Sequence, residues 1–405
     1  MSTNIALCQD GITQWLNLPH VVVQDVVMNE THTDLLLART PPSLRCSRCG
    51  QLSFNRYDRT RHRIRDLNVF ELHTYLVLDK WRVHCPTCGV RVEDLGFAAP
   101  YSRYTRRFED LVTRLCEHLP VANVADLLGM DWKTVKEIDK RALQRTFTNP
   151  DYTGLRVLSI DEIAYKKRHK YLTLVLDLER TRVVWVGKGR GKTTLEAFFD
   201  EIGEEVAHAI VSIAIDMWDP YIAAIQARAP QAAIVFDKFH VIRNYSKVVD
   251  RVRLDELSNA EKEEKPVIRG TKYLLLKNQE NLSPTQRNRL DELLSLNQNL
   301  SIVYLLKDDL KRLWDCTERE EAALLLADWT QAAEESGIEP LANFAMTLHR
   351  YAYGLLNHCD HPISNARLEG LNNKIKVIKR RCYGFHDLEY FALKIMQASV
   401  LNRPP

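Results

Sequence analysis

The sequence has 405 residues, 45% of them hydrophobic and 27% charged, which is typical of a globular protein with two or more domains. No apolar run reaches the roughly 20 residues that span a bilayer, and residues 1–30 lack the basic start and apolar stretch of a signal peptide. These features argue against a membrane protein and predict a cytoplasmic one. The net charge of +3 is unevenly spread, since residues 45–107 hold 13 Lys and Arg against 6 Asp and Glu. Such an excess favours a polyanionic partner, although a solvated surface also explains it.

Four of the nine cysteines form two C-x-x-C pairs, Cys46 with Cys49 and Cys85 with Cys88. One tight turn can aim both thiolates of a pair at a single metal ion, and each pair is followed by a glycine, which turns favour. Two pairs complete a tetrahedral structural Zn2+ site. The 35 residues between the pairs exceed the usual spacing of roughly 15–20, but the alternating stretch 70–83 gives room for a hairpin. A redox role is the alternative, and arginines beside both pairs make it less suitable.

Helical spacing of apolar residues begins after residue 105. The pattern predicts helices over 107–119, 121–129 and 130–143, with Pro120 after the first, Gly129 closing the second and Asp131 capping the third. A short helix, a glycine turn and a following helix are typical of a helix-turn-helix. Its recognition helix would present Lys133, Thr134 and Lys136 to DNA. A plain helical linker is the alternative.

A mixed α/β pattern follows Pro150. Three apolar, β-branched runs at 155–162, 171–179 and 181–189 predict an antiparallel start, followed by a helix, a strand at 209–216, a helix and a strand at 232–240. Asp161 ends the first predicted strand and Asp216 the fourth, so both carboxylates are expected at one edge of the sheet. Two carboxylates can hold a divalent cation but leave its site incomplete.

The stretch 364–381, SNARLEGLNNKIKVIKRR, contains a single acid among six basic residues. Helical spacing places an apolar stripe on one face of this stretch, made of Leu368, Leu371, Ile375 and Ile378. Glu369 lies on the polar face, together with Asn372, Asn373, Lys376 and Arg380. A helix beside the sheet would offer Glu369 to the metal and its cations to phosphates. The alternative is a surface contact of Glu369 with Arg367 or Asn373.

These motifs together resemble the ISL3 family of bacterial insertion-sequence transposases, from about Cys46 to the C-terminus. The most specific stretches are IDMWDPYIAAIQARAPQAAIVFDKFHVIRN and SNARLEGLNNKIKVIKRRCYGF. The resemblance implies a multidomain α/β protein with a zinc ribbon, a helix-turn-helix and a ribonuclease H-like mixed sheet with a DDE site. An all-helical insertion would precede the last core helix. The expected limits are 1–100 for the ribbon region, 101–150 for the helix-turn-helix, 151–250 and 361–405 for the core, and 251–360 for the insertion.

By the same resemblance, Asp161 and Glu369 are the first and last acids of the metal-binding triad. The second is Asp216, at the end of the fourth strand, or Asp237, in a D-x-x-H element with His240; we favour Asp216, with Asp237 and His240 as accessory groups. The triad would bind Mg2+ or Mn2+, as two ions. Arg367, Asn373, Lys376 and Arg380 would contact DNA.

The implied function is transposition by a bacterial, nucleoid-associated protein. It would bind double-stranded DNA, both terminal inverted repeats and target, as a homodimer or higher oligomer. A DNA-binding regulator without cleavage and a nuclease without strand transfer are the alternatives. The stretch GKGRGKTT is not a P-loop, because Val186 stands where that motif needs its first glycine. Its Lys188, Arg190 and Lys192 are candidates for phosphate contacts. Trp314 and Trp329 in the insertion could stack on bases, but packing is the commoner role.

Overall fold

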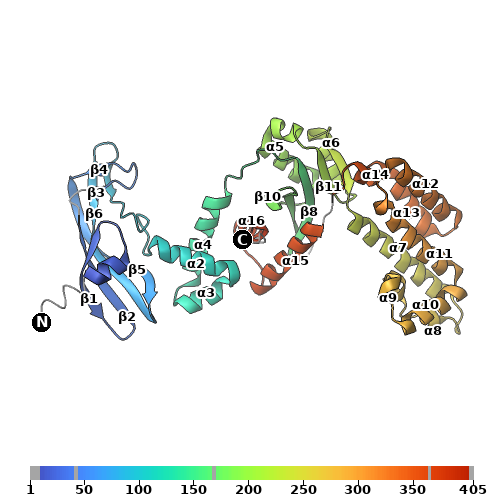
Figure 1. Cartoon of the computed structure of the whole chain (residues 1–405), viewed down its shortest axis with the longest axis horizontal. Helices are drawn as coiled ribbons and strands as arrows, with labels where there is room; N and C mark the ends of the chain where they lie inside the picture. The colour runs from blue at the N-terminus through green and yellow to red at the C-terminus, as the bar shows by residue number, and fades with distance from the viewer. Residues whose placement is uncertain (1–9, 41–43, 167–169, 364–365, 401–405) are drawn as a thin grey trace. The chain divides into compact units, whose positions relative to one another are not determined.

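A computed structural model describes residues 10–40, 44–166, 170–363 and 366–400, the last range without the side chains of 366–369. The chain divides into two compact units, Met1–Thr146 and Phe147–Pro405 (Figure 1). Among the helices of these described ranges, none has the length and apolarity needed to cross a membrane.

The first unit contains a sheet with the strand order β1-β2-β6-β5, in which β2 and β6 run parallel. Its strands are β1 (Val21–Met28), β2 (His32–Arg39), β5 (Arg56–Val69) and β6 (Leu72–Cys85), and β7 (Gly89–Val92) pairs with the end of β6. The expected hairpin between the cysteine pairs is present, but stretch 70–83 lies almost wholly in β6, and β5 is its partner. The alternation continues along β6 because Leu76 and Leu78 point into the core while their neighbours are half-exposed.

Three helices follow this sheet: α2 (Arg106–His118), α3 (Val121–Leu128) and α4 (Trp132–Phe147). Gly129 has a φ of 57° and closes α3, and Asp131 Oδ1 accepts hydrogen bonds from the backbone N–H of Lys133 (2.9 Å) and Thr134 (3.2 Å). The helices share one apolar core that includes Phe108, Val124 and Val135. This shared core excludes the alternative of a plain helical linker.

Buried polar contacts join the sheet to these helices. The Asp66 carboxylate is 1% exposed and accepts hydrogen bonds from Thr105 Oγ1 (2.6 Å) and Arg107 Nε (2.7 Å). Arg65 Nη2 donates to the carbonyl of Leu128, at the end of α3 (2.7 Å). A charge-assisted network removed from water fixes geometry, so the sheet holds α2 and α3 in one orientation.

The second unit has a sheet of order β10-β9-β8-β11-β12. Its strands are β8 (Val157–Lys166), β9 (Lys170–Asp177), β10 (Arg182–Lys188), β11 (Ser212–Ile215) and β12 (Ala233–Phe236). β8, β9 and β10 pair antiparallel, whereas β11 runs parallel to both β8 and β12. The predicted order of strands and helices is therefore correct.

Two predicted strand ends are wrong. β8 continues five residues beyond Asp161, because it stays paired with β9 as far as Lys166 after its pairing with β11 stops at Ser159. β12 ends at Phe236, because the Asp237 side chain accepts a hydrogen bond from Phe239 N–H and starts α7 (Lys238–Asn259).

Helices cover both faces of this sheet (Figure 1). On one face, α5 (Lys192–His208) and α6 (Asp219–Arg228) bury Leu158 and Ile160 of β8 in the larger core. On the other face, α15 (Ala366–Arg381) and α16 (Leu388–Val400) pack over Ile163. Leu371 and Ile375 are buried there and Ile378 is half-buried, as the apolar stripe predicts, while Leu368 lies outside the described side chains.

Residues 251–360, all described, contain helices and no strand. After α7 come α8 (Lys265–Ile268), α9 (Lys272–Leu276), α10 (Pro284–Leu296), α11 (Gln298–Arg312), α12 (Arg319–Glu335), α13 (Glu339–Arg350) and α14 (Ala352–Asp360). Trp329 is buried among them and donates from Nε1 to the carbonyl of Leu306, and Trp314 packs against the same core. Both tryptophans therefore serve packing. The chain returns to the sheet at α14, where Gly354 lies against the ring of Phe236.

Candidate metal centres and DNA-binding surfaces

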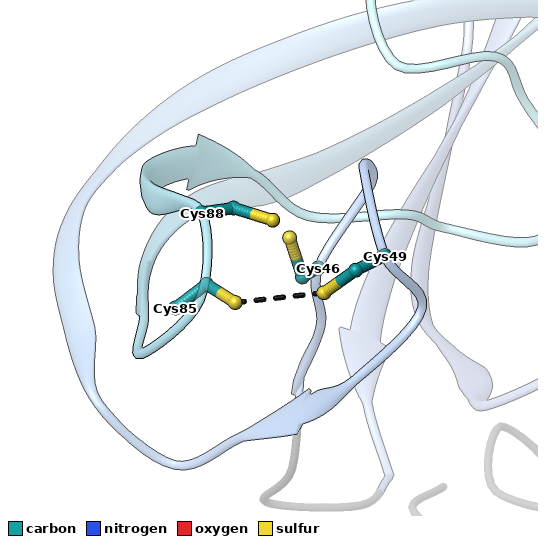
Figure 2. A group of neighbouring side chains, drawn as sticks. All are labelled: Cys46, Cys49, Cys85 and Cys88. Atoms are coloured by element: carbon teal, nitrogen blue, oxygen red, sulfur yellow. Dashed lines mark hydrogen bonds between the residues drawn. The ribbon is translucent and has the colours of Figure 1, made fainter.

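Two turns bring the paired cysteines together. Cys46 and Cys49 lie between the short strands β3 (Leu44–Arg45) and β4 (Leu52–Ser53), and Cys85 and Cys88 lie at the turn from β6 to β7. Their side chains point toward one another (Figure 2), and all four Sγ atoms lie within 4.8 Å of each other. The glycines after the pairs, Gly50 and Gly89, both have a φ of 71°, the left-handed conformation that the turns were expected to need.

The surroundings of Cys46 favour its thiolate form. Desolvation acts to raise the pKa of Cys46, but N–H groups of Cys49 and Arg48 hydrogen-bond to its sulfur and lower that pKa to about 7. Thiolates are the form in which cysteine binds zinc. Four sulfurs at these separations can surround a single ion, as four-cysteine zinc sites require.

A second cluster lies at the carboxyl ends of the parallel strands. Asp161, Asp216 and His240 offer ligand atoms that all lie within 4.8 Å of one another. The parallel register pairs Ala214 with Ser159, so Asp216, directly after β11, comes level with Asp161 on β8. His240 arrives from the first turn of α7, and its Nδ1 lies 2.6 Å from Asp216 Oδ1.

The electrostatics of this cluster follow from crowded carboxylates. Burial raises the pKa of Asp161, and the charge of Asp216 raises it further. Burial lowers the pKa of His240, but hydrogen bonds to Asp216 and Asp237 outweigh it and raise that pKa to about 10. His240 is therefore a cation that partly neutralises the acids around it.

The two candidates for the second aspartate have different surroundings. Asp237 has one oxygen at the N–H of Phe239 (3.3 Å) and the other 2.7 Å from His240 Nδ1, and its side chain is 9% exposed. The Asp216 side chain is 32% exposed and is the one that clusters with Asp161. Asp237 thus has a helix-capping role, whereas Asp216 has the more accessible carboxylate.

Asn372 is a residue of this site that the sequence did not single out. It donates from Nδ2 to Asp161 Oδ2 at 2.5 Å. The other oxygen of Asp161 accepts from the backbone N–H of Glu162 at 2.7 Å. The Oδ1 atom of Asn372 is buried and has no hydrogen-bond partner among the described residues. The available signal was its place on the polar face of the helix, beside Glu369.

The sequence did not single out Glu162 either. Its side chain lies on the opposite face of β8 from that of Asp161. Burial and the charges of Asp161 and Asp216 raise its pKa to about 7, while a hydrogen bond from Tyr221 acts in the other direction. Alternation along a strand accounts for the opposite directions of these two adjacent acids.

The remaining residues predicted on α15 divide into two groups. The side chains of Glu369 and Arg367 lie outside the described residues. Asn373, Lys376 and Arg380 are exposed along one face of the helix, away from the buried stripe. The Lys379 ammonium donates to the carbonyl of Ala164 (2.8 Å), so α15 follows β8 from Asp161 to Ala164.

The loop before α5 carries a cation close to the same edge. The Arg190 guanidinium lies over the rings of Tyr171 (4.4 Å) and Trp218 (5.0 Å), and Trp218 Nε1 donates to the carbonyl of Arg190 (3.1 Å). Lys188, Arg190 and Lys192 are all exposed. Trp218 comes two residues after Asp216 in the chain. Its contact with Arg190 therefore places positive charge of this loop near that acid.

The Asp219 carboxylate joins two helices that are far apart in the sequence. Asp219 is the first residue of α6, and its carboxylate accepts hydrogen bonds from Tyr351 Oη (2.7 Å) and Arg350 Nη2 (2.9 Å). These contacts tie the end of α13 to the start of α6.

On α4, the predicted DNA-reading positions lie in the first two turns. Lys133 is exposed, whereas Thr134 and Lys136 are half-buried. Trp132 is 53% exposed, with the Lys133 ammonium 5.9 Å from its ring centroid. The accessible tip of the helix is therefore basic and aromatic.

Comparison with known proteins agrees with a division of the chain into a cysteine-containing region, a group of three helices and an α/β unit. Residues 158–395 match a family model described as a transposase, residues 93–143 match the helix-turn-helix domain of transposase family ISL3, and residues 42–88 match the zinc-finger of transposases IS204/IS1001/IS1096/IS1165. The chain is 40% identical to the transposase for insertion sequence element IS1001 of Bordetella parapertussis, over 90% of this chain and 91% of that relative. It is 28% identical to the transposase for IS1557 of Mycobacterium tuberculosis H37Rv, over 95% and 93%. The zinc ribbon, the helix-turn-helix and the α/β unit are thus parts of one known arrangement, and the chain belongs to the ISL3 family of transposases.

Proposed function

We propose that this chain moves an insertion sequence by binding its terminal inverted repeats and catalysing cleavage and transfer of DNA strands. The observation that carries the proposal is the Asp161–Asp216 pair at the carboxyl edge of the sheet, in a chain whose relatives are named transposases. Paired carboxylates beside exposed cations suit a reaction at a phosphodiester.

We propose further that the α/β unit is a ribonuclease H-like core. Three antiparallel strands followed by two parallel ones, with the fourth strand beside the first, support this assignment. The fourth strand is where that fold is expected to carry its second acid, and Asp216 directly follows β11.

Asp161, Asp216 and Glu369 would hold the catalytic Mg2+ or Mn2+ ions. The fit rests on hard oxygen donors within 4.8 Å and on the buried Oδ1 of Asn372, which has no partner among the described side chains. Residues 369 and 372 are three apart on α15, so helical periodicity gives them a common face, which supports Glu369 as the third ligand. Such ions, when bound, activate the attacking oxygen and stabilise the leaving one.

The side chains around the acids hold the carboxylates in place and bind the DNA. His240 keeps Asp216 and Asp237 in place, and Asn372 does so for Asp161. Exposed Asn373, Lys376 and Arg380, with Arg367, would bind phosphates on either side of the bond that is cut. The attacking groups are water and then a DNA 3′-hydroxyl, so the reaction needs no covalent bond to protein.

In the first unit, the four cysteines would bind one Zn2+, and α4 would read bases with Lys133, Thr134 and Lys136 while arginines contact phosphates. Transposition joins two element ends, so we propose a homodimer or higher oligomer on DNA, in the nucleoid of a bacterial cytoplasm.

A cleavage assay tests the proposal. Full-length protein with Mg2+ should nick labelled duplexes that carry the element's own ends, and should join those ends to a target. Binding without cleavage would favour the regulator, and cleavage without joining would favour the nuclease.

A further inference from the structure

Helix α15 ends in a turn that normally requires glycine but holds a tyrosine. Gly384 N–H donates to the carbonyl of Lys379 (3.0 Å) and Tyr383 N–H to that of Arg380 (3.1 Å), the two bonds of a Schellman motif. The left-handed residue of this motif is Tyr383, with a φ of 51°. A side chain in that conformation has a steric cost that glycine avoids.

The tyrosine ring makes no contribution to packing that would offset this cost. Its relative exposure is 101%, so it buries no surface against the protein. The aromatic residue two positions later behaves differently, since Phe385 stacks on Phe391 at 4.6 Å between ring centroids. Folding therefore explains Phe385 and leaves Tyr383 unexplained.

The surroundings of Tyr383 are those of a nucleic-acid surface. Lys376, Arg380 and Arg381 are exposed on the last two turns of the helix. Asn372 marks the point where the helix meets Asp161, and residue 383 lies eleven residues further on. At 1.5 Å per residue, this is about 16 Å from the carboxylates along the helix axis.

We propose that Tyr383 stacks on a base of the bound DNA that has left its pair, about five nucleotides from the phosphate that is cut. This deepens the proposed function and rests on it. For a duplex whose axis runs along α15, the 16 Å offset corresponds to about five steps of 3.4 Å along one strand. Aromatic rings stack on any base, and a fully exposed ring beside three cations can reach one while phosphates are held. A base must leave the helical stack before a side chain can cover its face.

The test uses the full-length protein and duplexes of the element's end, without divalent metal. 2-Aminopurine is placed singly at each position about three to seven nucleotides from the cleaved phosphate. One position should differ in fluorescence from the free duplex with the wild type and with Tyr383→Phe. With Tyr383→Gly and Tyr383→Leu that signal should return to the free-duplex value, and the Kd should rise at least about fivefold.

Two further measurements make the result decisive. The Tm of Tyr383→Gly should equal or exceed that of the wild type, because glycine relieves the left-handed turn; a lower Tm would show that the ring supports the fold and would overturn the proposal. Tyr273, 73% exposed on α9, provides the matched control, and Tyr273→Ala should leave fluorescence and Kd unchanged. If the wild type binds and cuts the ends, and Tyr383→Gly and Tyr383→Leu give the same fluorescence and Kd as the wild type, the stacking proposal is wrong and the proposed function stands. If the wild type neither binds nor cuts the ends, the proposed function is wrong.

Discussion

Asn372 and Asp161, 211 positions apart in the chain, are joined by a hydrogen bond of 2.5 Å from Nδ2 to Oδ2. The bond fixes the position of α15 along β8. It therefore also fixes where the other residues on the polar face of the helix lie relative to Asp161. Asn372 Oδ1 is buried and has no hydrogen-bond partner within the part of the chain that the structure describes. A buried acceptor without a partner is costly, and a cation bound at Asp161 would give it one.

Removing this amide should weaken metal binding. We expect Asn372→Ala to fold and bind DNA, but to need about 10–100 times more Mn2+ for half-maximal cleavage, because residues that orient a ligand affect metal affinity by that factor. Titration calorimetry with Mn2+ should give the same shift without DNA. In the DNA-free titration Asn373→Ala is the control, since Asn373 is exposed at the next position and its proposed role is in DNA binding. An equal shift there would mean that the effect is not specific to the Asp161 contact.

The cysteine cluster predicts one Zn2+ per chain. Cys85→Ser should release the ion and unfold the surrounding strands, because Cys85 is buried beside Val83 and Leu44 and such sites couple metal binding to folding. Elemental analysis of purified protein measures the stoichiometry. Cys382→Ser, outside the cluster, should keep its zinc; a wild-type protein purified without zinc would contradict the assignment.

Gly354 should be intolerant of any side chain. A Cβ there would collide with the ring of Phe236, where α14 packs on β12. Gly354→Ala should therefore destabilise the second unit by about 1–3 kcal/mol. Gly370→Ala is the matched helical control: its Cβ meets no atom within 4 Å among those that the structure describes, and alanine should stabilise α15 by about 0.5–1 kcal/mol. Thermal denaturation of both variants measures the contrast, and equal Tm values would contradict it.

Local patterns predicted much of this fold because they are set by near neighbours. Gly129 and Asp131 mark their turn through chemistry within three residues, and the strands β9 and β10 are short apolar runs with turn residues between them. β5 escaped prediction as a strand because its exposed positions from Arg56 to Arg63 carry no apolar alternation. It is a strand because β6 pairs with it along almost its whole length.

The candidate site was predictable in kind but not in detail. Strand ends suggested that Asp161 and Asp216 would meet, and parallel register brings them together. The contact of Asn372 with Asp161 depends on how a helix near the C-terminus rests on the sheet, and no local pattern encodes that distance. The same holds for Asp219, whose partners Arg350 and Tyr351 follow a helical region of more than 100 residues.

Substitutions that remove the charge of a carboxylate but keep its size can decide which acids bind the metal ions. Asp161→Asn, Asp216→Asn and Glu369→Gln should each fold, bind the element's ends and lose cleavage by a factor of about 100 or more, because each loses the charge that holds the metal ions. Combining any two should add little, since the ligands act as one unit.

Asp237→Asn separates the two possible second ligands. Asparagine can still cap α7, but it loses the charge that pairs with His240, so this variant should lower Tm and retain most of its cleavage rate at a temperature where it is folded. Asp216→Asn should lower Tm less, because its side chain is 32% exposed against 9% for Asp237, and should lose cleavage. Single-turnover cleavage measured beside thermal denaturation separates the two effects. An active Asp216→Asn with an inactive but stable Asp237→Asn would move the ligand to Asp237, and an active Glu369→Gln would reduce that acid to a surface ion pair, worth under about 1 kcal/mol.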